Sequence, residues 1–122
     1  MSGLGLDHVQ VAIPAGGEAI ARAFYGELLG LTEMEKPAAL AGRVGCWFTL
    51  GDRQLHLGVD PDFRPATKAH VAMVSGGLAD LRARLEVAGV TTRDDAPIDG
   101  RERFFADDPF GNRLEFLQHD AA

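Results

Sequence analysis

The chain has 122 residues, enough for one globular domain with a sizeable core but not for two of ordinary size. Its 46% apolar and 25% charged residues are typical of a folded protein rather than a disordered one. Twelve Lys and Arg against eighteen Asp and Glu give a net charge of −6 without any basic run, which argues against nucleic acid or an anionic membrane as a partner.

The sequence also indicates the cellular compartment of the protein. No apolar run approaches the roughly 20 residues of a membrane helix, and the N-terminal residues lack the apolar core of a signal peptide. Cys46 is the only cysteine, so an internal disulfide and a thiolate metal cluster are both excluded. We therefore expect a cytoplasmic protein in which Cys46 has a buried structural role.

The first half of the chain begins with a strand and a helix. Residues 6–13 (LDHVQVAI) alternate in polarity with period two, which predicts a strand with His8 and Gln10 on its polar face. Residues 18–30 then carry apolar side chains at helical spacing, which predicts an amphipathic helix. Its apolar stripe consists of Ile20, Phe24 and Leu28. Two strands follow near 42–50 and 53–59, and a weaker one near 31–36.

The second half repeats this order. A strand is predicted over 68–74 and a helix over 78–88, followed by strands near 101–107 and 112–118. The apolar stripe of the helix consists of Leu78, Leu81 and Leu85. The turn between the last two strands is Asp108-Pro109-Phe110-Gly111, and Asp107 and Asp108 are expected to serve that turn.

The two halves correspond residue by residue. Gly30-Leu31-Thr32 matches Gly89-Val90-Thr91, and Leu55-His56-Leu57 matches Leu114-Glu115-Phe116, both at an offset of 59. The chain therefore contains two strand–helix–strands modules, one at about 4–60 and one at about 66–119. Since neither module could bury its sheet alone, we expect a single α+β domain over residues 1–122.

Four chemically competent side chains occupy equivalent places in the two modules. His8 and His70 lie on the first strands, and His56 and Glu115 lie on the last strands. Their neighbours along each strand are apolar and can pack under the helices. If each sheet curves with its helix on the outside, the three imidazoles and the carboxylate point into one concave cleft.

This set suits a divalent transition metal, because imidazole and carboxylate ligands bind zinc, nickel, iron, cobalt and manganese. A position left open in the metal's coordination shell would accept a substrate or water. His119, four residues after Glu115, is expected to be peripheral. A structural role for each histidine is the alternative, but three repeat-equivalent imidazoles on one face favour a metal site.

Further polar and aromatic residues share the predicted face. The candidates for orienting the imidazoles or contacting substrate are Gln10, Trp47, Gln54 and Arg113, with a water-exposed rim as the alternative. Trp47 and Phe48 alternate along one strand, so one lines the cleft and the other packs in the core. Three other arginines could bind an anionic group but are expected to be solvated: Arg64, Arg101 and Arg103.

Five motifs resemble the vicinal oxygen chelate superfamily, which includes glyoxalase I, bleomycin-resistance proteins, fosfomycin-resistance transferases and extradiol dioxygenases. They span both halves of the chain: DHVQVAI with His8, FYGELLGL, LHLG with His56, AHVAM with His70, and DPFGNRLEF with Glu115. The resemblance implies paired βαβββ modules around a metal that two substrate oxygens chelate. It implies His8, His70 and Glu115 as ligands, and a homodimer.

One position departs from the glyoxalase I pattern. His56 occupies the place where those enzymes carry Glu or Gln, so it is expected to be a fourth ligand or a general base. The departure leaves the metal open and disfavours glutathione-hemithioacetal isomerisation.

Three functions are then in competition. The first is a metal-dependent enzyme of the glyoxalase/dioxygenase type, lyase, isomerase or oxygenase, that acts on a small oxygen-rich molecule, with Glu115 and His56 as catalytic residues. The second is an antibiotic-sequestering resistance protein without turnover, its cleft lined by Trp47, Phe104 and Phe105. The third is an inherited metal site without activity.

Overall fold

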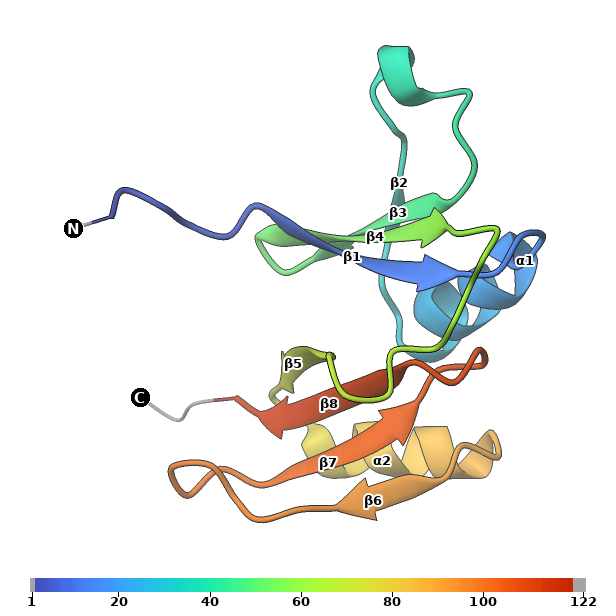
Figure 1. Cartoon of the computed structure of the whole chain (residues 1–122). Helices are drawn as coiled ribbons and strands as arrows, with labels where there is room; N and C mark the ends of the chain where they lie inside the picture. Colours follow the sequence, from blue (N-terminus) through green and yellow to red (C-terminus); the bar gives the residue numbers. More distant parts are fainter. Residues whose placement is uncertain (1, 120–122) are drawn as a thin grey trace. The chain divides into compact units, whose positions relative to one another are not determined.

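The computed structural model describes residues 2–119, which divide into two compact units at the Arg64–Pro65 bond. Each unit contains one four-stranded mixed sheet and one main helical segment (Figure 1). This arrangement confirms the predicted α+β class with tandem βαβββ modules. Among the described residues, no helix is long and apolar enough to span a membrane.

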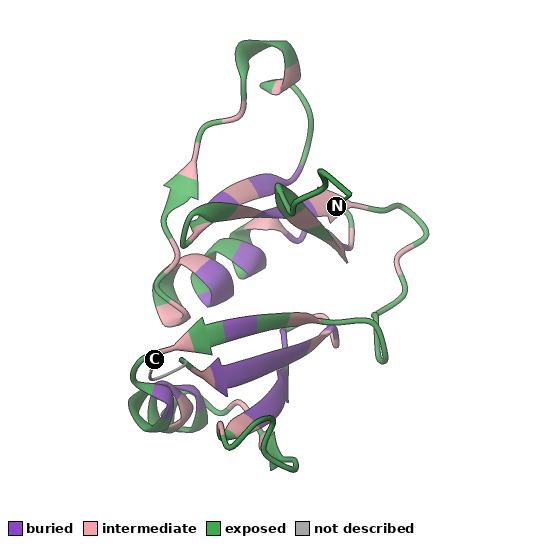
Figure 2. Cartoon of the chain, turned by 90° about the vertical axis from the view of Figure 1, so that its left-hand side faces the viewer, coloured by how far each residue is buried: buried purple, intermediate pink, exposed green. Residues whose placement is uncertain are grey.

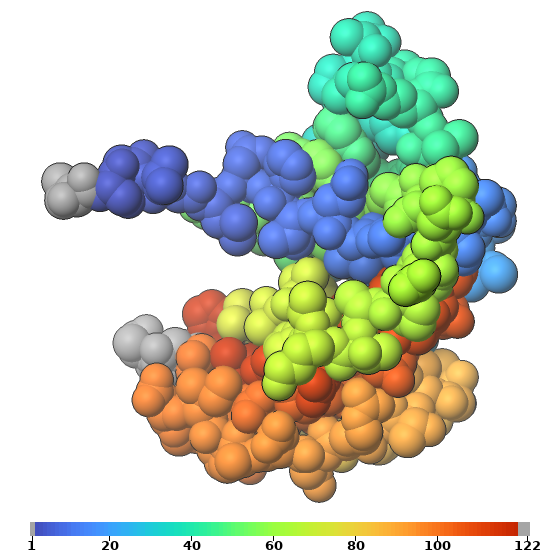
Figure 3. Space-filling view, in the orientation of Figure 1, coloured from blue at the N-terminus to red at the C-terminus, as the bar shows by residue number. Residues whose placement is uncertain are grey.

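The first unit has the strand order β1-β4-β3-β2. Its elements are β1 (His8–Ile13), α1 (Glu18–Ala21), the π-helix η1 (Arg22–Leu28), β2 (Glu33–Met34), the 3₁₀-helix η2 (Ala38–Leu40), β3 (Cys46–Leu50) and β4 (Arg53–Val59). β1 runs parallel to β4, and the remaining pairs are antiparallel. In the space-filling view, the N-terminal segment 2–7 (dark blue) projects from this unit and is exposed throughout (Figure 3).

The prediction of the apolar stripe on the first helix is wrong, because the buried side includes the residues that follow Ile20 and Phe24. Ile20 is 55% exposed, and the buried side is formed by Ala21, Phe24 and Tyr25. Both the predicted and the observed stripe contain Phe24. The observed one also buries the Tyr25 ring against Phe48, which removes more apolar area from water than burial of Ile20 would. The segment also widens into a π-helix after Ala21, which the 3.6-residue pattern does not predict.

The second unit has the strand order β5-β8-β7-β6. Its elements are β5 (Val71–Ser75), α2 (Leu78–Val87), β6 (Thr92–Asp94), β7 (Arg103–Asp107) and β8 (Arg113–Gln118). The predicted helix stripe is confirmed, since Leu78, Leu81 and Leu85 are all buried. Buried residues follow the central strands of each sheet (Figure 2).

Several predicted boundaries are also wrong. The strand expected near 42–50 begins only at Cys46, because Gly45 has φ +96° and a Cβ there would lie 2.2 Å from the Leu57 carbonyl oxygen. The strand expected from residue 68 begins at Val71, and β6 and η2 are not predicted. Asp107 belongs to β7 and pairs with Arg93, so only Asp108 serves the turn.

The strand registers confirm the duplication. Val9 pairs with Leu55 in the first unit, and Val71 pairs with Leu114 at the same place in the second. On the other side of the β4 and β8 strands, Trp47 pairs with His56 as Phe105 pairs with Glu115. Each unit thus presents a histidine at the start of its first strand (His8) or directly before it (His70), beside a polar residue on its last strand.

Candidate functional site

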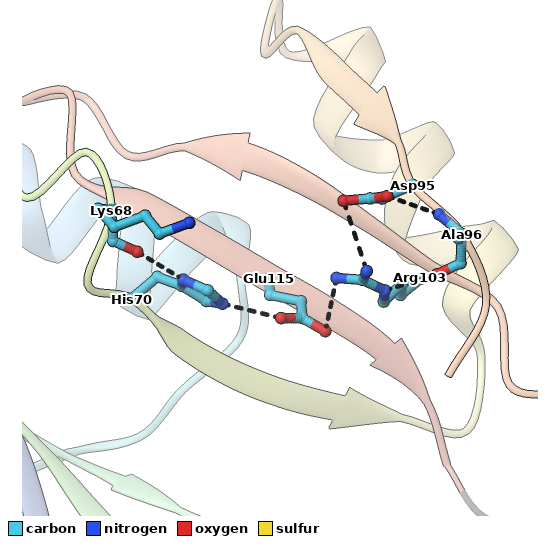
Figure 4. A network of polar contacts seen from close by, with 6 residues as sticks. All are labelled: Lys68, His70, Asp95, Ala96, Arg103 and Glu115. Atoms are coloured by element: carbon cyan, nitrogen blue, oxygen red, sulfur yellow. Dashed lines mark hydrogen bonds and ion pairs between the residues drawn. The ribbon is translucent and has the colours of Figure 1, made fainter. Parts of the chain in front are cut away.

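In the second unit, His70 and Glu115 converge. His70 directly precedes β5, and Glu115 lies on the neighbouring parallel strand β8. The Nε2 atom of His70 is 2.9 Å from Oε1 of Glu115, whose side chain is only 6% exposed (Figure 4).

The hydrogen bonds of His70 restrict what can lie at this contact. Its Nδ1 lies 2.9 Å from the Lys68 carbonyl oxygen, which can only accept, so Nδ1 carries a hydrogen. A neutral imidazole has one N–H, and Nε2 would then direct a lone pair at a carboxylate. With the Nδ1 hydrogen engaged in this way, the contact with Glu115 is favourable when either a proton or a metal ion lies between Nε2 and the carboxyl oxygen.

The second carboxylate oxygen of Glu115 faces Arg103. Its Oε2 lies 3.5 Å from Nη1 of Arg103, which also approaches Asp95 and donates from Nε to the Ala96 carbonyl oxygen at 2.7 Å. The Arg103 side chain is 15% exposed, so the prediction that it is solvated is wrong. Alternation on β7 places it on the Glu115 face, where these acceptors offset its burial.

In the first unit, three rings form a stack. The His56 ring lies between Trp47, at a centroid distance of 3.8 Å and an interplanar angle of 3°, and His8, at 4.1 Å and 17°. Trp47 is the cross-strand partner of His56, so Trp47 takes the site face and Phe48 is buried in the core. This resolves which of the two aromatic residues lies beside the imidazoles.

Hydrogen bonds orient both imidazoles of this stack. Nδ1 of His8 donates to Asp7 at 2.8 Å, which leaves the lone pair on Nε2 and lowers the pKa of the Asp7 carboxyl through the hydrogen bond. Nε2 of His56 donates to Oε1 of Gln54 at 2.8 Å, which leaves the lone pair on Nδ1. Burial lowers the pKa of His56, and the neighbouring His8 lowers it further.

The remaining polar candidates have distinct environments. The Gln10 side chain lies against its own sheet over Gly58, where a Cβ would come within 2.8 Å of its Cδ. The guanidinium carbon of Arg113 lies 4.0 Å from the Phe105 ring centroid, and its buried Nε has no hydrogen-bond partner among the residues that the structure describes. His119 is exposed, as predicted.

Two partners of the histidines were not predicted. Asp7 directly precedes His8 in the sequence, so its carboxylate could have been recognised there as a hydrogen-bond acceptor for the imidazole. The Lys68 carbonyl is a main-chain group that any residue type could supply, so the sequence carries no signal for it.

The structure thus brings His8 and His56 together in one unit, and His70 and Glu115 together in the other. Within residues 2–119, no three or more His, Cys, Asp and Glu side chains are gathered so that they could hold a metal. The four-ligand set therefore stays a prediction, for which the lone pairs of His8 and His70 and the Glu115 carboxylate are chemically suitable.

A cavity of about 640 Å³ lies beside the ring stack within the first unit. Trp47 and Cys46 line it together with Arg22, Glu33 and Lys36. The Cys46 residue is 1% exposed, and burial raises the pKa of its thiol. Arg22 pairs with Glu33 at 2.9 Å, and Lys36 donates to the Gly45 carbonyl oxygen, so both cations of the cavity wall have partners.

The structure is similar to solved structures of glyoxalase-like proteins. A glyoxalase family protein from Bacillus anthracis is 44% identical, with a TM-score of 0.90 and 96% of each chain covered. A lactoylglutathione lyase from Agrobacterium tumefaciens is 19% identical, with a TM-score of 0.67 over 90% of this chain and 91% of that one. A genomically encoded fosfomycin resistance protein from Listeria monocytogenes is 14% identical, with a TM-score of 0.73 over 97% and 95%. The last two show the fold alone.

No protein-family model matches the sequence, and no curated protein matches it significantly. The similarity to the Bacillus protein extends over almost the full length of both chains, and it agrees with the motifs that carry His8, His70 and Glu115. The chain belongs to the glyoxalase family of the vicinal oxygen chelate superfamily.

Proposed function

We propose that this protein is a metal-dependent enzyme of the glyoxalase/dioxygenase type that acts on a small molecule with two neighbouring oxygens. The observation that carries the proposal is the contact between His70 and Glu115, where a metal ion can take the place of a shared proton because the Lys68 carbonyl already takes the Nδ1 hydrogen. Glu115 is buried, and Arg103 supplies a compensating charge to its Oε2, while its Oε1 is directed toward Nε2 of His70.

The residues present fit a divalent metal such as zinc, nickel, iron, cobalt or manganese. His8 and His70 each have Nδ1 held by an acceptor, the arrangement that orients metal-binding imidazoles and directs their Nε2 lone pairs outward. Together with Glu115 they would hold the ion. When bound, the metal would act as a Lewis acid toward the two substrate oxygens.

His56 has a different task in this proposal. Gln54 holds its Nε2 hydrogen, and burial keeps the ring neutral, so Nδ1 can take a proton from the substrate or act as a fourth ligand. Trp47 covers one face of the ring and excludes water from it. Arg103 holds Oε2 of Glu115, which leaves Oε1 directed toward His70.

A second candidate function is the capture of a small molecule without turnover. The large Trp47 surface beside the histidines and the net charge of −6 favour a cationic aromatic ligand in that case. Such binding would be independent of metal.

Cobalt(II) titration distinguishes the two candidates, because the visible absorption of the ion reports its ligands. We expect one equivalent per chain to bind, and Glu115→Gln to weaken binding by roughly tenfold to a hundredfold, as loss of a metal-site residue does. His119→Gln, which alters the exposed histidine, is the matched control and should bind as the wild type does. Wild-type protein that binds no cobalt, or Glu115→Gln protein that binds it equally well, would contradict the enzyme proposal.

A further inference from the structure

We infer that the small molecule bound by this protein is a carboxylate, and that Arg113 binds its carboxylate group. The inference rests on the proposed function in one respect, namely that the ligand occupies the His70–Glu115 face. Beyond the proposed function, it specifies the charge and the chemical class of the ligand.

The position of Arg113 places it on that face. Arg113 lies two residues before Glu115 on β8, so the two side chains emerge on the same side of the sheet. Its guanidinium stacks on Phe105, at 4.0 Å from the ring centroid, and Phe105 is the cross-strand partner of Glu115. The same Phe105 ring meets the edge of His70 at a centroid distance of 5.3 Å. The guanidinium therefore lies over a ring that contacts His70 and is paired across the strands with Glu115.

The charges around Arg113 leave it without an acid. Arg103, the other arginine on this face, is neutralised by Glu115 and Asp95. Asp107 is the cross-strand partner of Arg113, but its carboxylate pairs with Arg93 at 3.0 Å. No ion pair to Arg113 occurs within residues 2–119, and its Nε is buried without an acceptor.

The duplication sharpens this contrast. Gln54 occupies the equivalent position in the first unit, 59 residues earlier, and it is engaged with His56. Arg113 has no such partner in its own unit, so its donors remain for a ligand. A buried donor without an acceptor is unfavourable, and a ligand oxygen would remove that cost.

The planar fork of a guanidinium matches a carboxylate, which it binds through two parallel N–H···O bonds. An α-hydroxy or α-oxo acid combines this group with a neighbouring oxygen, so one such molecule could meet Arg113 and the His70–Glu115 pair together.

The test uses two probes that differ in one group. Mandelate carries a carboxylate beside a hydroxyl, and phenylethylene glycol replaces that carboxylate with a hydroxymethyl group. Binding of both probes is measured by calorimetry on the full chain, with and without added zinc, and the metal content of every sample is determined. The variants are Arg113→Gln, Arg113→Lys and the control Arg84→Gln, which removes the same charge from an exposed position on α2.

We expect wild-type protein to prefer mandelate, and Arg113→Gln to weaken mandelate binding by roughly tenfold or more, as loss of a charge-assisted pair does. Arg113→Lys should retain part of the affinity, and Arg84→Gln should retain all of it. Phenylethylene glycol should bind wild type and Arg113→Gln alike.

Equal affinity of wild type and Arg113→Gln for mandelate, or no preference for mandelate in the wild type, would overturn the inference. Absence of binding by either probe counts as no preference. If zinc binds while the preference is absent, only the inference fails. If mandelate binding depends on Arg113 but no metal binds, the inference stands and the proposed metal-dependent function fails.

Discussion

At the residue scale, the ring stack makes the protonation of His56 observable. Trp47 is the only tryptophan and lies 3.8 Å from the His56 ring, and a protonated imidazole quenches indole fluorescence on contact. Because burial lowers the pKa of His56, we expect the fluorescence to fall on acidification with a midpoint below pH 6.5. A midpoint at or above that value, or the same transition in a His56→Gln variant, would contradict the assignment.

The lowered pKa of His56 also predicts how the free energy of unfolding depends on pH. Since the pKa of His56 is lower in the folded chain than in the unfolded one, the unfolded chain binds the proton more readily. The contribution of neutral His56 is complete above the unfolded value of about 6.5 and is lost as the pH falls below it. His56→Gln should flatten the fall in unfolding free energy below this pH in urea titrations.

Cys46 provides a second prediction for a single residue. Its side chain is buried, and burial raises the pKa of the thiol, so little thiolate is present and access to it is blocked. We expect a disulfide reagent such as Ellman's to label Cys46 slowly in native protein and at once in urea. Rapid labelling of native protein would show that the cavity beside Trp47 admits the reagent to a reactive thiolate.

The sequence identifies the candidate residues themselves but not their orientation. His8, His56, His70 and Glu115 are recognisable because strand alternation and the repeat place them together. The environment of Arg103 is not recognisable in the sequence, because an arginine among charged neighbours is normally expected to be solvated. Only the pairing of β7 with β8 places it beside Glu115. The hydrogen bond from His70 to the Lys68 carbonyl depends on the main chain alone.

At the element scale, the turn before β8 positions Glu115. The Asp108 carboxylate accepts hydrogen bonds from the Phe110 and Asn112 amides, and the Asn112 side chain joins Asp108 to the amide of Ala66. Both side chains are at least 96% buried, so the network is shielded from water. It fixes the start of the strand that carries Arg113 and Glu115.

Removal of this network should be costly. Asn112→Ala deletes two buried hydrogen bonds and leaves the Ala66 amide without its acceptor, so we expect a loss of about 2–4 kcal/mol in the free energy of unfolding. Urea denaturation measures this loss, and Asp52→Ala in the exposed turn before β4 should cost about 0.5 kcal/mol or less. Equal losses in the two variants would show that the turn is not a structural determinant.

Long strands and the second helix were predictable because their polarity follows one clear period. The three residues of β6 and the two of β2 are too short to show an alternation, and their pairing with longer strands determines them. The π-helix and the shifted stripe around Tyr25 depend on tertiary packing against Phe48, which overrides local spacing.

At the scale of the whole molecule, duplication separates a shared scaffold from divergent chemistry. Equivalent positions hold buried leucines at Leu55 and Leu114, which preserve each sheet. The adjacent positions hold His56 in one module and Glu115 in the other. A duplicated fold can therefore carry different candidate ligands at equivalent positions of its two modules. The offset of 59 residues makes this equivalence recognisable in the sequence.

The prediction of a single domain, a homodimer and a four-ligand cleft concerns relations between modules. Sequence periodicity predicts the strands of each sheet and the two faces of that sheet. How two sheets pack together depends on their surfaces, which the periodicity of either module does not predict. These relations stay predictions, and metal binding tests them because His8 and His70 belong to different units.

The most direct measurement is therefore the metal content of the protein, purified without chelators, for wild type, His8→Ala, His70→Ala and the control His119→Ala. We expect about one equivalent of a divalent transition metal per chain in the wild type and the control, with loss in both of the other variants. Absence of metal from the wild type after reconstitution with each candidate ion, or retention in the His70→Ala variant, would contradict this expectation.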